Sequence, residues 1–578
     1  MNFPRIRPSA IERGPLTVLV LCVSLLLIAL LSRGFWVVGM GLTVALVLTV
    51  AMRVDGRTPY RWSTEWIGYR RGYAARRAEL VRVPRISEVE VAAGVCGIRH
   101  VGDSLVAMIQ LVPNLDLPTV IADTTIYTED TVPFAALLPL REQYGVTLDL
   151  DVVTTGSRTR ATGGYTMLYD QLIGTTAVVG SRVTWLVVRL DQRRNLAALS
   201  RRGSVVAVAP GTLATAAHRI ATRLREQGIG AHPLPAAALS DAMRLLHAGV
   251  ELADLRERWG CLQSSVPGRT VTSFLVDWSR LGVGGLATCW ATSRGHTTVV
   301  VPVGEVENGH RVLVRYVGPP VSAARHSYLR SLAGHQSTAL QASLAGGVTV
   351  SELTDPHDSG GGARPAELAI PIGPNGQVLG SLEGRPRHAL ALPLYDPAGY
   401  NPRRRTVEVH AKLSVAQQIV LRATAVGAEV EIHTDRPNSW RHLVAAVGDP
   451  ASLRLGAEHA TAADADAASI AVFDHVAPRA TTAQTTIVIS DPGGPRTGGA
   501  DLVIDQVSTS AVDISMPTRT VRVDLIEPRG ETRYLEPTPE QLELTAARVT
   551  ATPGGSTPAG GIRSGETDGS GNVYRRGS

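Results

Sequence analysis

The stretch Val183-Thr184-Trp185-Leu186-Val187-Val188-Arg189-Leu190 is almost continuously apolar and rich in β-branched side chains. Such a run predicts a strand, and the lack of polar alternation indicates a sheet that is covered on both faces. Downstream, apolar residues from Leu213 to Leu224 recur every three or four positions, and Gly228 marks the end of the predicted helix. A strand followed by a helix of this kind predicts an α/β fold.

Strand and helix patterns continue on both sides of this stretch. Further strands are expected within Gly97–Val112, Leu117–Ile121 and Val146–Val153, with helices within Pro133–Tyr144 and Leu168–Leu172. The alternation in Val146–Val153 predicts a half-buried strand. We therefore expect a first α/β domain over residues 86–262.

A second α/β region is expected over residues 263–535. Its clearest unit is a strand at Ala389–Leu394, followed by a helix from Ser414 whose Gln417 completes an S-x-x-Q capping box. Strands around Val430, Ile487 and Val521 follow, and residues 355–365 and 460–468 are predicted to be surface loops. Residues 536–578 are rich in Pro, Thr, Gly and Ser, which predicts a disordered tail.

Two apolar stretches open the chain, Leu16–Leu31 and Phe35–Met52, separated by Ser32-Arg33-Gly34. Each approaches the roughly 20 residues that a helix needs to cross a bilayer. After a short N-terminus (1–14), we expect a transmembrane hairpin over residues 15–53, with spans at about 15–32 and 35–53. A secretory signal peptide is less consistent, because the connector offers no small-residue cleavage site.

The arginines predict the orientation of this hairpin. Residues 1–85 hold thirteen arginines and four acidic residues, a surplus of nine, whereas the whole chain carries only +6. Only Arg33 lies in the connector, so both ends of the hairpin are expected on the cytoplasmic side. The prediction is an inner-membrane protein with two spans, with both termini and the large domain cytoplasmic. Because the basic charge is concentrated in the N-terminal segment, a nucleic-acid-binding body is disfavoured.

Residues 54–85 predict a basic amphipathic helix beside the membrane, most clearly over 58–82. Aromatic rings recur there with a helical period, flanked by guanidinium groups. Such a helix suits anionic lipid headgroups, and the same stripe suits docking of a partner subunit. The candidate membrane or partner interface consists of Trp62, Trp66, Tyr69, Arg70, Arg71, Tyr73, Arg76 and Arg77.

Signatures of catalysis are weak. Lys412 is the single lysine and follows no glycine run, so the chain has no P-loop, and its four cysteines include no C-x-x-C. Asp149-Leu150-Asp151 is a D-x-D, the pattern by which sugar-nucleotide transferases hold a divalent cation. Both aspartates are expected on the solvated face of a strand, so a structural role is favoured. We predict no catalytic, cofactor-binding or metal-binding residues.

Several segments, in matching order over roughly residues 15–450, resemble one protein family. They are Met108–Pro113, Leu117–Ile121, Leu168–Gly174, Thr184–Arg189, His218–Leu224, Leu255–Trp259, Pro371–Gly373 and Val420–Ala428. The family is EccE, a component of the type VII (ESX) secretion membrane complex of mycobacteria and related actinobacteria.

The resemblance implies a non-enzymatic structural subunit at the periphery of an inner-membrane assembly with EccB, EccC and EccD, in which EccC carries the motor. It supplies no catalytic residues. The alternative function is a membrane-tethered, metal-dependent glycosyltransferase-like enzyme that uses Asp149 and Asp151.

Overall fold

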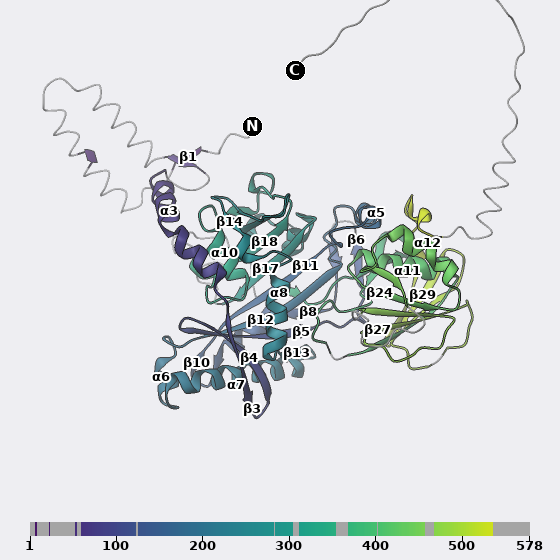
Figure 1. Ribbon diagram of the computed structural model, residues 1–578, viewed down its shortest axis with the longest axis horizontal. Helices are drawn as coiled ribbons and strands as arrows, with labels where there is room; N and C mark the ends of the chain where they lie inside the picture. The colour runs from purple at the N-terminus through teal and green to yellow at the C-terminus, as the bar shows by residue number, and fades with distance from the viewer. Residues whose placement is uncertain are drawn as a thin grey trace, which may run out of the picture. The chain divides into compact units, whose positions relative to one another are not determined.

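The computed structural model divides into two units, Met1–Leu535 and Glu536–Ser578. The residues whose structure is described are 6–8, 22–23, 52–54, 59–122, 125–282, 284–304, 311–353, 368–401, 403–456, 468–496 and 498–535. The predicted tail and the loops at 355–365 and 460–467 lie outside these residues. Within the described part of the first unit, the chain forms two large sheets with helices packed on them (Figure 1), so the protein is a mixed α/β protein.

Most of the predicted transmembrane hairpin lies outside the described residues. Among those described, no helix has the length and apolar character needed to cross a bilayer. At the end of the predicted second span, β2 (Met52–Val54) is a short strand that pairs with β1 (Ile6–Pro8). The hairpin at 15–53 therefore stays a prediction.

The first large sheet has twelve strands within the described residues, and its main path runs β14-β15-β16-β18-β17-β11-β12-β5-β4-β3. Two more strands pair at its sides, β13 with β5 and β19 with β16. The bounds are β3 (Arg85–Val91), β4 (Gly94–Val101), β5 (Ser104–Val112), β11 (Asp149–Ser157), β12 (Ser181–Asp191), β13 (Gly230–Pro233), β14 (Arg256–Glu257), β15 (Leu262–Gln263), β16 (Thr270–Val276), β17 (His296–Val303), β18 (Val312–Gly318) and β19 (Leu329–Ser331).

Both faces of this sheet are buried, as the apolar run in β12 predicts. On one face, Leu186, Val188 and Leu190 join a core with α7 (Val205–Glu226). On the other, Trp185 and Val187 join a core with α8 (Ala236–Leu246) and α10 (Gln336–Ser343). Continuous apolar strands are typical of parallel sheets, yet every pairing in this sheet is antiparallel. The run in β12 is apolar because helices cover both faces of the sheet.

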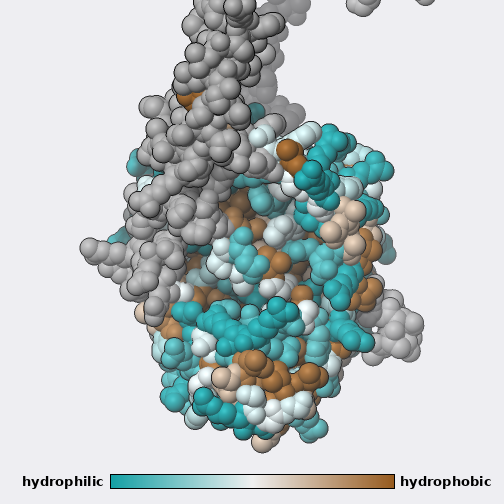
Figure 2. Space-filling view, turned by 90° about the vertical axis from the view of Figure 1, so that its left-hand side faces the viewer, coloured by the Kyte–Doolittle hydropathy of each residue, from teal (hydrophilic) through white to brown (hydrophobic). Residues whose placement is uncertain are grey.

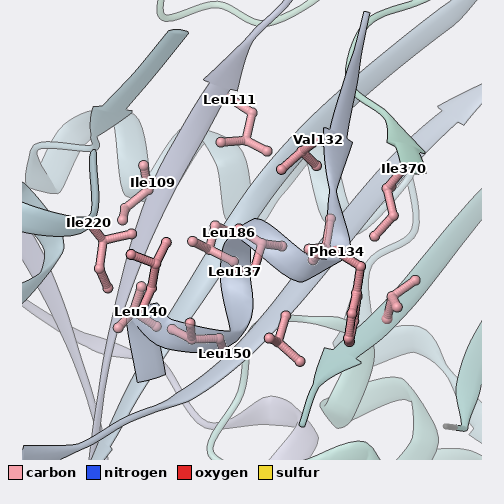
Figure 3. Packing of buried hydrophobic residues seen from close by; sticks show 14 of the residues in the cluster. Ile109, Leu111, Val132, Phe134, Leu137, Leu140, Leu150, Leu186, Ile220 and Ile370 are labelled. Atoms are coloured by element: carbon pink, nitrogen blue, oxygen red, sulfur yellow. The ribbon is translucent and has the colours of Figure 1, made fainter. Parts of the chain in front are cut away.

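The α7 face is closed by a short connection between the two sheets. After β8 (Thr131–Pro133), the helix α4 (Phe134–Leu137) and the turn η1 (Leu138–Arg141) lay their apolar side chains over β11 and β12 (Figure 3). Phe134 and Leu137 are fully buried. The predicted helix at 133–144 is thus shorter than expected, since β9 (Glu142–Gln143) pairs with β10 (Val146–Thr147).

The second large sheet also has twelve strands among the described residues, in the order β25-β24-β26-β27-β23-β28-β29-β30-β21-β22-β6-β7. The half from β25 to β28 is parallel, and the half from β28 to β7 is antiparallel. The bounds are β6 (Thr119–Ala122), β7 (Thr125–Tyr127), β21 (Gln377–Leu382), β22 (Arg385–Leu392), β23 (Arg405–His410), β24 (Val430–Thr434), β25 (Leu453–Leu455), β26 (Ile470–Asp474), β27 (Thr485–Ser490), β28 (Leu502–Gln506), β29 (Ala511–Met516) and β30 (Arg519–Leu525).

The two sheets exchange segments along the chain. Strands β6 and β7 follow β5 of the first sheet but extend the second. Likewise α5 (Gly164–Ile173), which connects β11 to β12, buries Tyr165 and Tyr169 in the second core. The expected boundary at 262/263 falls inside the first sheet, within the strand β15. Sequence periodicity detects elements but not their pairing over long separations, so it does not reveal this exchange.

The helix α11 (Leu413–Ala425) packs on the second sheet and starts as the sequence indicates, but not for the predicted reason. Its N-cap is Lys412, and no side chain caps it. The capping box at Ser414 and Gln417 is therefore wrong: Gln417 Nε2 instead donates to the carbonyl of Ser439 in α12 (Pro437–Val447), 2.8 Å away. At the other end, Gly427 follows the helix with φ 107°, a conformation that favours glycine just after a helix C-terminus.

Candidate functional site: helix α3 and its anchor on the first sheet

The helix α3 (Pro59–Val81) matches the basic amphipathic helix expected over 58–82. Pro59 is its first residue, a position where the missing N–H costs nothing. The helix ends shortly before β3, so it joins the predicted membrane segment to the first sheet. Figure 1 shows it beside α10.

One face of α3 packs against the body of the protein. The residues on this face recur every three or four positions, and the deepest of them, Leu80, is buried in the core that α8 and α10 share. The face consists of Glu65, Tyr69, Gly72, Arg76 and Leu80. The predicted aromatic stripe straddles its edge, because Tyr69 faces the body while Trp66 and Tyr73 stay 39% and 38% exposed.

Tyr69 and Arg76 form the centre of the anchor. The Tyr69 hydroxyl donates to the carbonyl of Glu257 (3.2 Å), and its ring meets Trp259 edge-on with centroids 5.3 Å apart. The Arg76 guanidinium pairs with the nearly buried Glu257 carboxylate (3.0 Å) and lies over the Tyr69 ring. Burial first, and then the charge of Glu257, raise the pKa of Tyr69, so its hydroxyl stays a donor at neutral pH.

Arg77 extends the anchor by one turn. Its guanidinium donates to the carbonyls of Leu255 (3.1 Å) and Ala253 (3.3 Å), next to the turn η2 (Leu252–Asp254). Two arginines and one tyrosine therefore hold α3 on residues 253–259. These partners lie about 180 positions downstream, a separation at which sequence periodicity gives no signal.

The remaining candidate residues face away from the anchor. The Arg70 guanidinium stacks over the Trp66 ring at 4.8 Å, and Arg71 and Tyr73 are exposed. Trp62 lies in the first turns of α3, but its side chain is outside the described residues. The structure thus separates the predicted set into an anchoring group (Tyr69, Arg76, Arg77) and an outward group (Trp66, Arg70, Arg71, Tyr73).

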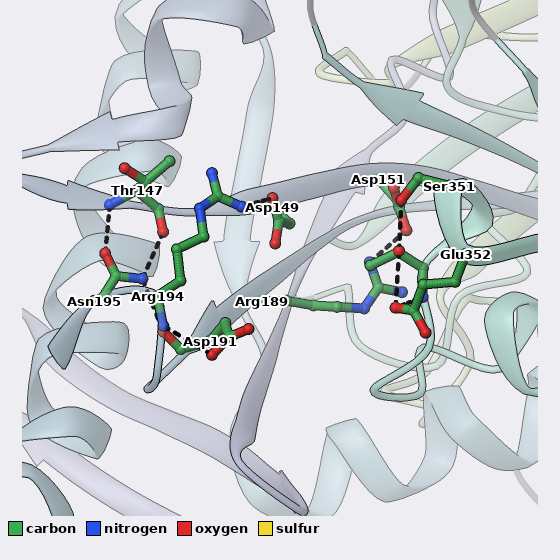
Figure 4. A network of polar contacts seen from close by, with 10 residues as sticks. Thr147, Asp149, Asp151, Arg189, Asp191, Arg194, Asn195, Ser351 and Glu352 are labelled. Carbon is green, nitrogen blue, oxygen red and sulfur yellow. Dashed lines mark hydrogen bonds and ion pairs between the residues drawn. The ribbon is translucent and has the colours of Figure 1, made fainter. Parts of the chain in front are cut away.

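The two aspartates of the D-x-D pair with different arginines. Asp149 pairs with Arg194 (2.8 Å) at the surface, whereas Asp151 pairs with Arg189, and both members of that second pair are at most 4% exposed (Figure 4). The expectation that both aspartates are solvated is therefore wrong for Asp151, because helices cover both faces of β11. Among the described residues, no three His, Cys, Asp or Glu side chains gather as metal ligands would.

The parallel half of the second sheet carries a polar cluster that the sequence did not single out. At the ends of β23 and β27, Ser490 Oγ lies 2.6 Å from His410 Nδ1, and His410 Nε2 lies 3.3 Å from Glu408. The order of groups resembles a nucleophile–base–acid relay. However, His410 and Glu408 are both 3% exposed, so a substrate has no access to the base.

The chain is similar to known proteins of type VII (ESX) secretion systems. Residues 178–276 match the family model described as type VII ESX secretion system translocon, EccE. The ESX-2 secretion system protein EccE2 of Mycobacterium tuberculosis is 27% identical over 74% of this chain and 79% of its own length. The ESX-1 protein EccE1 of Mycolicibacterium smegmatis is 27% identical over 67% and 74%, respectively.

A third relative, the ESX-5 protein EccE5 of Mycobacterium marinum, is 28% identical over a shorter region, 37% of this chain. The family match runs from β12 to β16, and so includes residues 253–259, which hold α3. Within this region, Leu255–Trp259 is also one of the segments on which the resemblance to EccE proteins was based. Over most of its length, the chain is therefore similar to EccE proteins of ESX secretion systems.

Proposed function

We propose that this protein is a membrane-anchored, non-enzymatic structural subunit of a type VII (ESX) secretion complex and stabilises the assembly at its periphery. The relatives are named as ESX secretion system proteins, which supports a secretion subunit over the glycosyltransferase-like alternative. The observation that carries the mechanism is the anchor of α3 on residues 253–259.

The anchor makes α3 a rigid connection between membrane and body. A helix of 23 residues spans roughly 35 Å at 1.5 Å per residue. Because Tyr69, Arg76, Arg77 and Leu80 fix one face of this helix, the body cannot swivel freely about it. A subunit that holds neighbours in position needs such a stiff connection.

The outward group is the contact surface in this proposal. Trp66 and Tyr73 present amphipathic rings, and Arg70 and Arg71 present guanidinium groups beside them. Such groups bind anionic headgroups and also pack against protein. We propose EccB, EccC or EccD, together with anionic lipids, as the partners of this surface.

The proposed topology places both termini and the large body in the cytoplasm, with two spans in the inner membrane. Protease added outside intact spheroplasts should leave the body uncut, whereas protease added after lysis should cut it. Digestion from outside would contradict the topology.

The subunit role is tested by incorporation into the complex. The variant Trp66→Ala/Tyr73→Ala should reduce co-purification with the other ESX subunits at least several-fold on native electrophoresis. Extraction of the protein by alkaline carbonate should stay unchanged, because the hairpin inserts without these side chains.

The matched control is Tyr127→Ala/Tyr400→Ala, which removes two rings that are 61% and 41% exposed on the body. It should co-purify like the wild type. Equal losses in both double variants, or release of Trp66→Ala/Tyr73→Ala from the membrane, would contradict the role of the outward group. A wild-type chain that is only ever monomeric beside an intact complex would contradict the proposed function.

A further inference from the structure

The far end of the first sheet carries a compact exposed projection. After β12, the chain turns into α6 (Leu196–Ser200) and reverses through residues 201–204 into α7. We call residues 193–207 the α6–α7 elbow. Its base is fixed, since Asn195 and Leu199 are buried and Asn195 exchanges hydrogen bonds with the backbone of Thr147.

The elbow exposes several aliphatic side chains. Val206 is 81% exposed, Leu196 is 56% exposed, and Ala197 and Ala207 beside them are exposed as well. Figure 2 looks onto the side of the molecule on which Figure 1 places α6, and it shows hydrophobic surface at the lower end beneath a hydrophilic band. Exposed aliphatic side chains that gather in one place mark interaction surfaces more often than scattered ones do.

Four arginines frame this apolar tip, Arg193 and Arg194 before α6 and Arg201 and Arg202 after it. Two pair with acidic residues at the surface, Arg193 with Asp103 and Arg194 with Asp149. Arg202 donates only to the carbonyl of Tyr144 (2.9 Å), and Arg201 forms no ion pair with any described residue. The side of the elbow at 201–202 therefore carries two positive charges without a carboxylate.

We propose that the α6–α7 elbow docks an acidic amphipathic helix of another subunit of the secretion complex, an inference that rests on the proposed function. Apolar side chains of that helix would cover Leu196 and Val206, and carboxylates along its flank would pair with Arg201 and Arg202. A helix that presents apolar residues and carboxylates on the same side is complementary to the exposed aliphatic residues and the arginines of the elbow.

Position favours a protein over a lipid surface. The elbow lies on the α7 face of the first sheet, where Leu199 joins the α7 core. Helix α3, which leads to the predicted membrane segment, packs on the opposite face through Leu80. In addition, the elbow (residues 193–207) contains no Trp or Phe side chain that could insert into a bilayer.

The test is photo-cross-linking in the intact complex, with a benzophenone amino acid in place of Val206. The full-length chain is expressed with the other ESX subunits and purified as the complex. We expect adducts with a segment of another subunit that has net negative charge and apolar residues at helical spacing. The variant Arg201→Glu/Arg202→Glu should reduce the adduct at least tenfold.

The control Arg385→Glu/Arg387→Glu makes the same charge change at two exposed arginines of β22 and should leave the adduct unchanged. The inference is overturned if the chain is in the complex but the probe labels lipid, a second copy of this chain or nothing. It is also overturned if the partner segment is basic, or if both double variants act alike. If the chain is absent from the complex, the proposed function fails and takes the inference with it.

Discussion

One buried arginine–carboxylate pair lies in the first large sheet, and another lies beside the second sheet, where it joins two helical elements. In the first sheet, Asp151 of β11 meets Arg189 of the neighbouring strand β12, and both are nearly inaccessible. Beside the second sheet, Arg422 of α11 meets Glu531, 109 positions away in the turn η9 (Glu531–Arg533). The first pair links two adjacent strands, whereas the second fastens the end of the described chain to a central helix.

The pairs also differ in how completely their atoms are satisfied. Both Glu531 oxygens accept hydrogen bonds, from Tyr165, Gln418 and Arg422. In the first sheet, Arg189 donates to Asp151 and to the carbonyl of Gly346, but its Nη2 has no hydrogen-bond partner. Since a buried charge is tolerated in proportion to how well it is satisfied, the carboxylate with more partners should be the more costly to remove.

The largest effect is therefore expected for Glu531→Ala. This change leaves the Arg422 charge uncompensated and removes an acceptor from Tyr165 and Gln418, a loss of about 3–5 kcal/mol. Urea unfolding of the full chain in detergent measures it, and hydrogen exchange should show protection lost first in α5 and α11. The control Glu383→Ala removes an exposed carboxylate that lies 3.9 Å from Arg522 and should cost less than about 1 kcal/mol.

A second comparison lies within the D-x-D of the first sheet. Asp151→Ala should cost about 3 kcal/mol, because Arg189 stays buried without its counter-ion. Asp149→Ala breaks an ion pair whose side chains are 32% and 44% exposed, so it should cost less than about 1 kcal/mol. Equal losses in the two variants would show that the burial difference between these aspartates does not control stability.

Hydrogen exchange separates the two regions. Loss of Asp151 should expose β11 and β12 before α5 and α11, whereas loss of Glu531 should expose α5 and α11 before β11 and β12. If both changes loosened the same elements, the two sheets would unfold as one unit and the comparison would not hold.

The sequence predicted local elements well where one periodicity dominates. The run in β12, the stripe of α7 and the basic helix α3 all lie where the pattern places them. A local pattern records which side of an element is apolar. It therefore predicted that β12 is covered on both faces without specifying whether its neighbours are parallel or antiparallel.

What the sequence could not provide is the identity of distant partners. Tyr69 and Arg76 were selected as an outward surface, but Glu257 and Trp259 occupy one side of that stripe. In the same way, Asp151 was expected in solvent because Val146–Val153 alternates, and helices from later in the chain cover it. Both errors come from contacts over long separations, which composition and spacing do not encode.

A smaller effect involves pH and again concerns the first sheet. His296 of β17 lies 2.8 Å from the Thr155 hydroxyl, and desolvation followed by the charge of Arg315 lowers its pKa to about 3. The unfolded chain takes up a proton on this ring below about pH 6.5, while the folded chain does not. Its contribution to stability is therefore complete above that pH and is lost as the pH falls toward 3.

Between pH 7 and pH 5, this one histidine should lower the free energy of unfolding by about 2 kcal/mol. Denaturant unfolding of the wild type and of His296→Gln, compared at both pH values, isolates the contribution of His296 to the free energy of unfolding. Asp130 and Asp396, whose pKa values burial raises to about 6, act in the opposite direction, but they act equally in both proteins. A variant that loses as much stability as the wild type on acidification would remove His296 as the source.

The smallest effect is expected in the second sheet, at the start of α11. The S-x-x-Q pattern assigns Ser414 and Gln417 to one capping box, whereas in the structure no side chain caps the helix and Gln417 Nε2 donates to Ser439 in α12. Gln417→Ala should cost about 1 kcal/mol, because a buried hydrogen bond between two helices is lost. Ser414→Ala should be nearly neutral, whereas loss of an N-cap serine typically costs about 1 kcal/mol. Thermal unfolding of the two variants distinguishes the assignments, since a capping box predicts losses for both and the inter-helix bond predicts a loss for Gln417 alone.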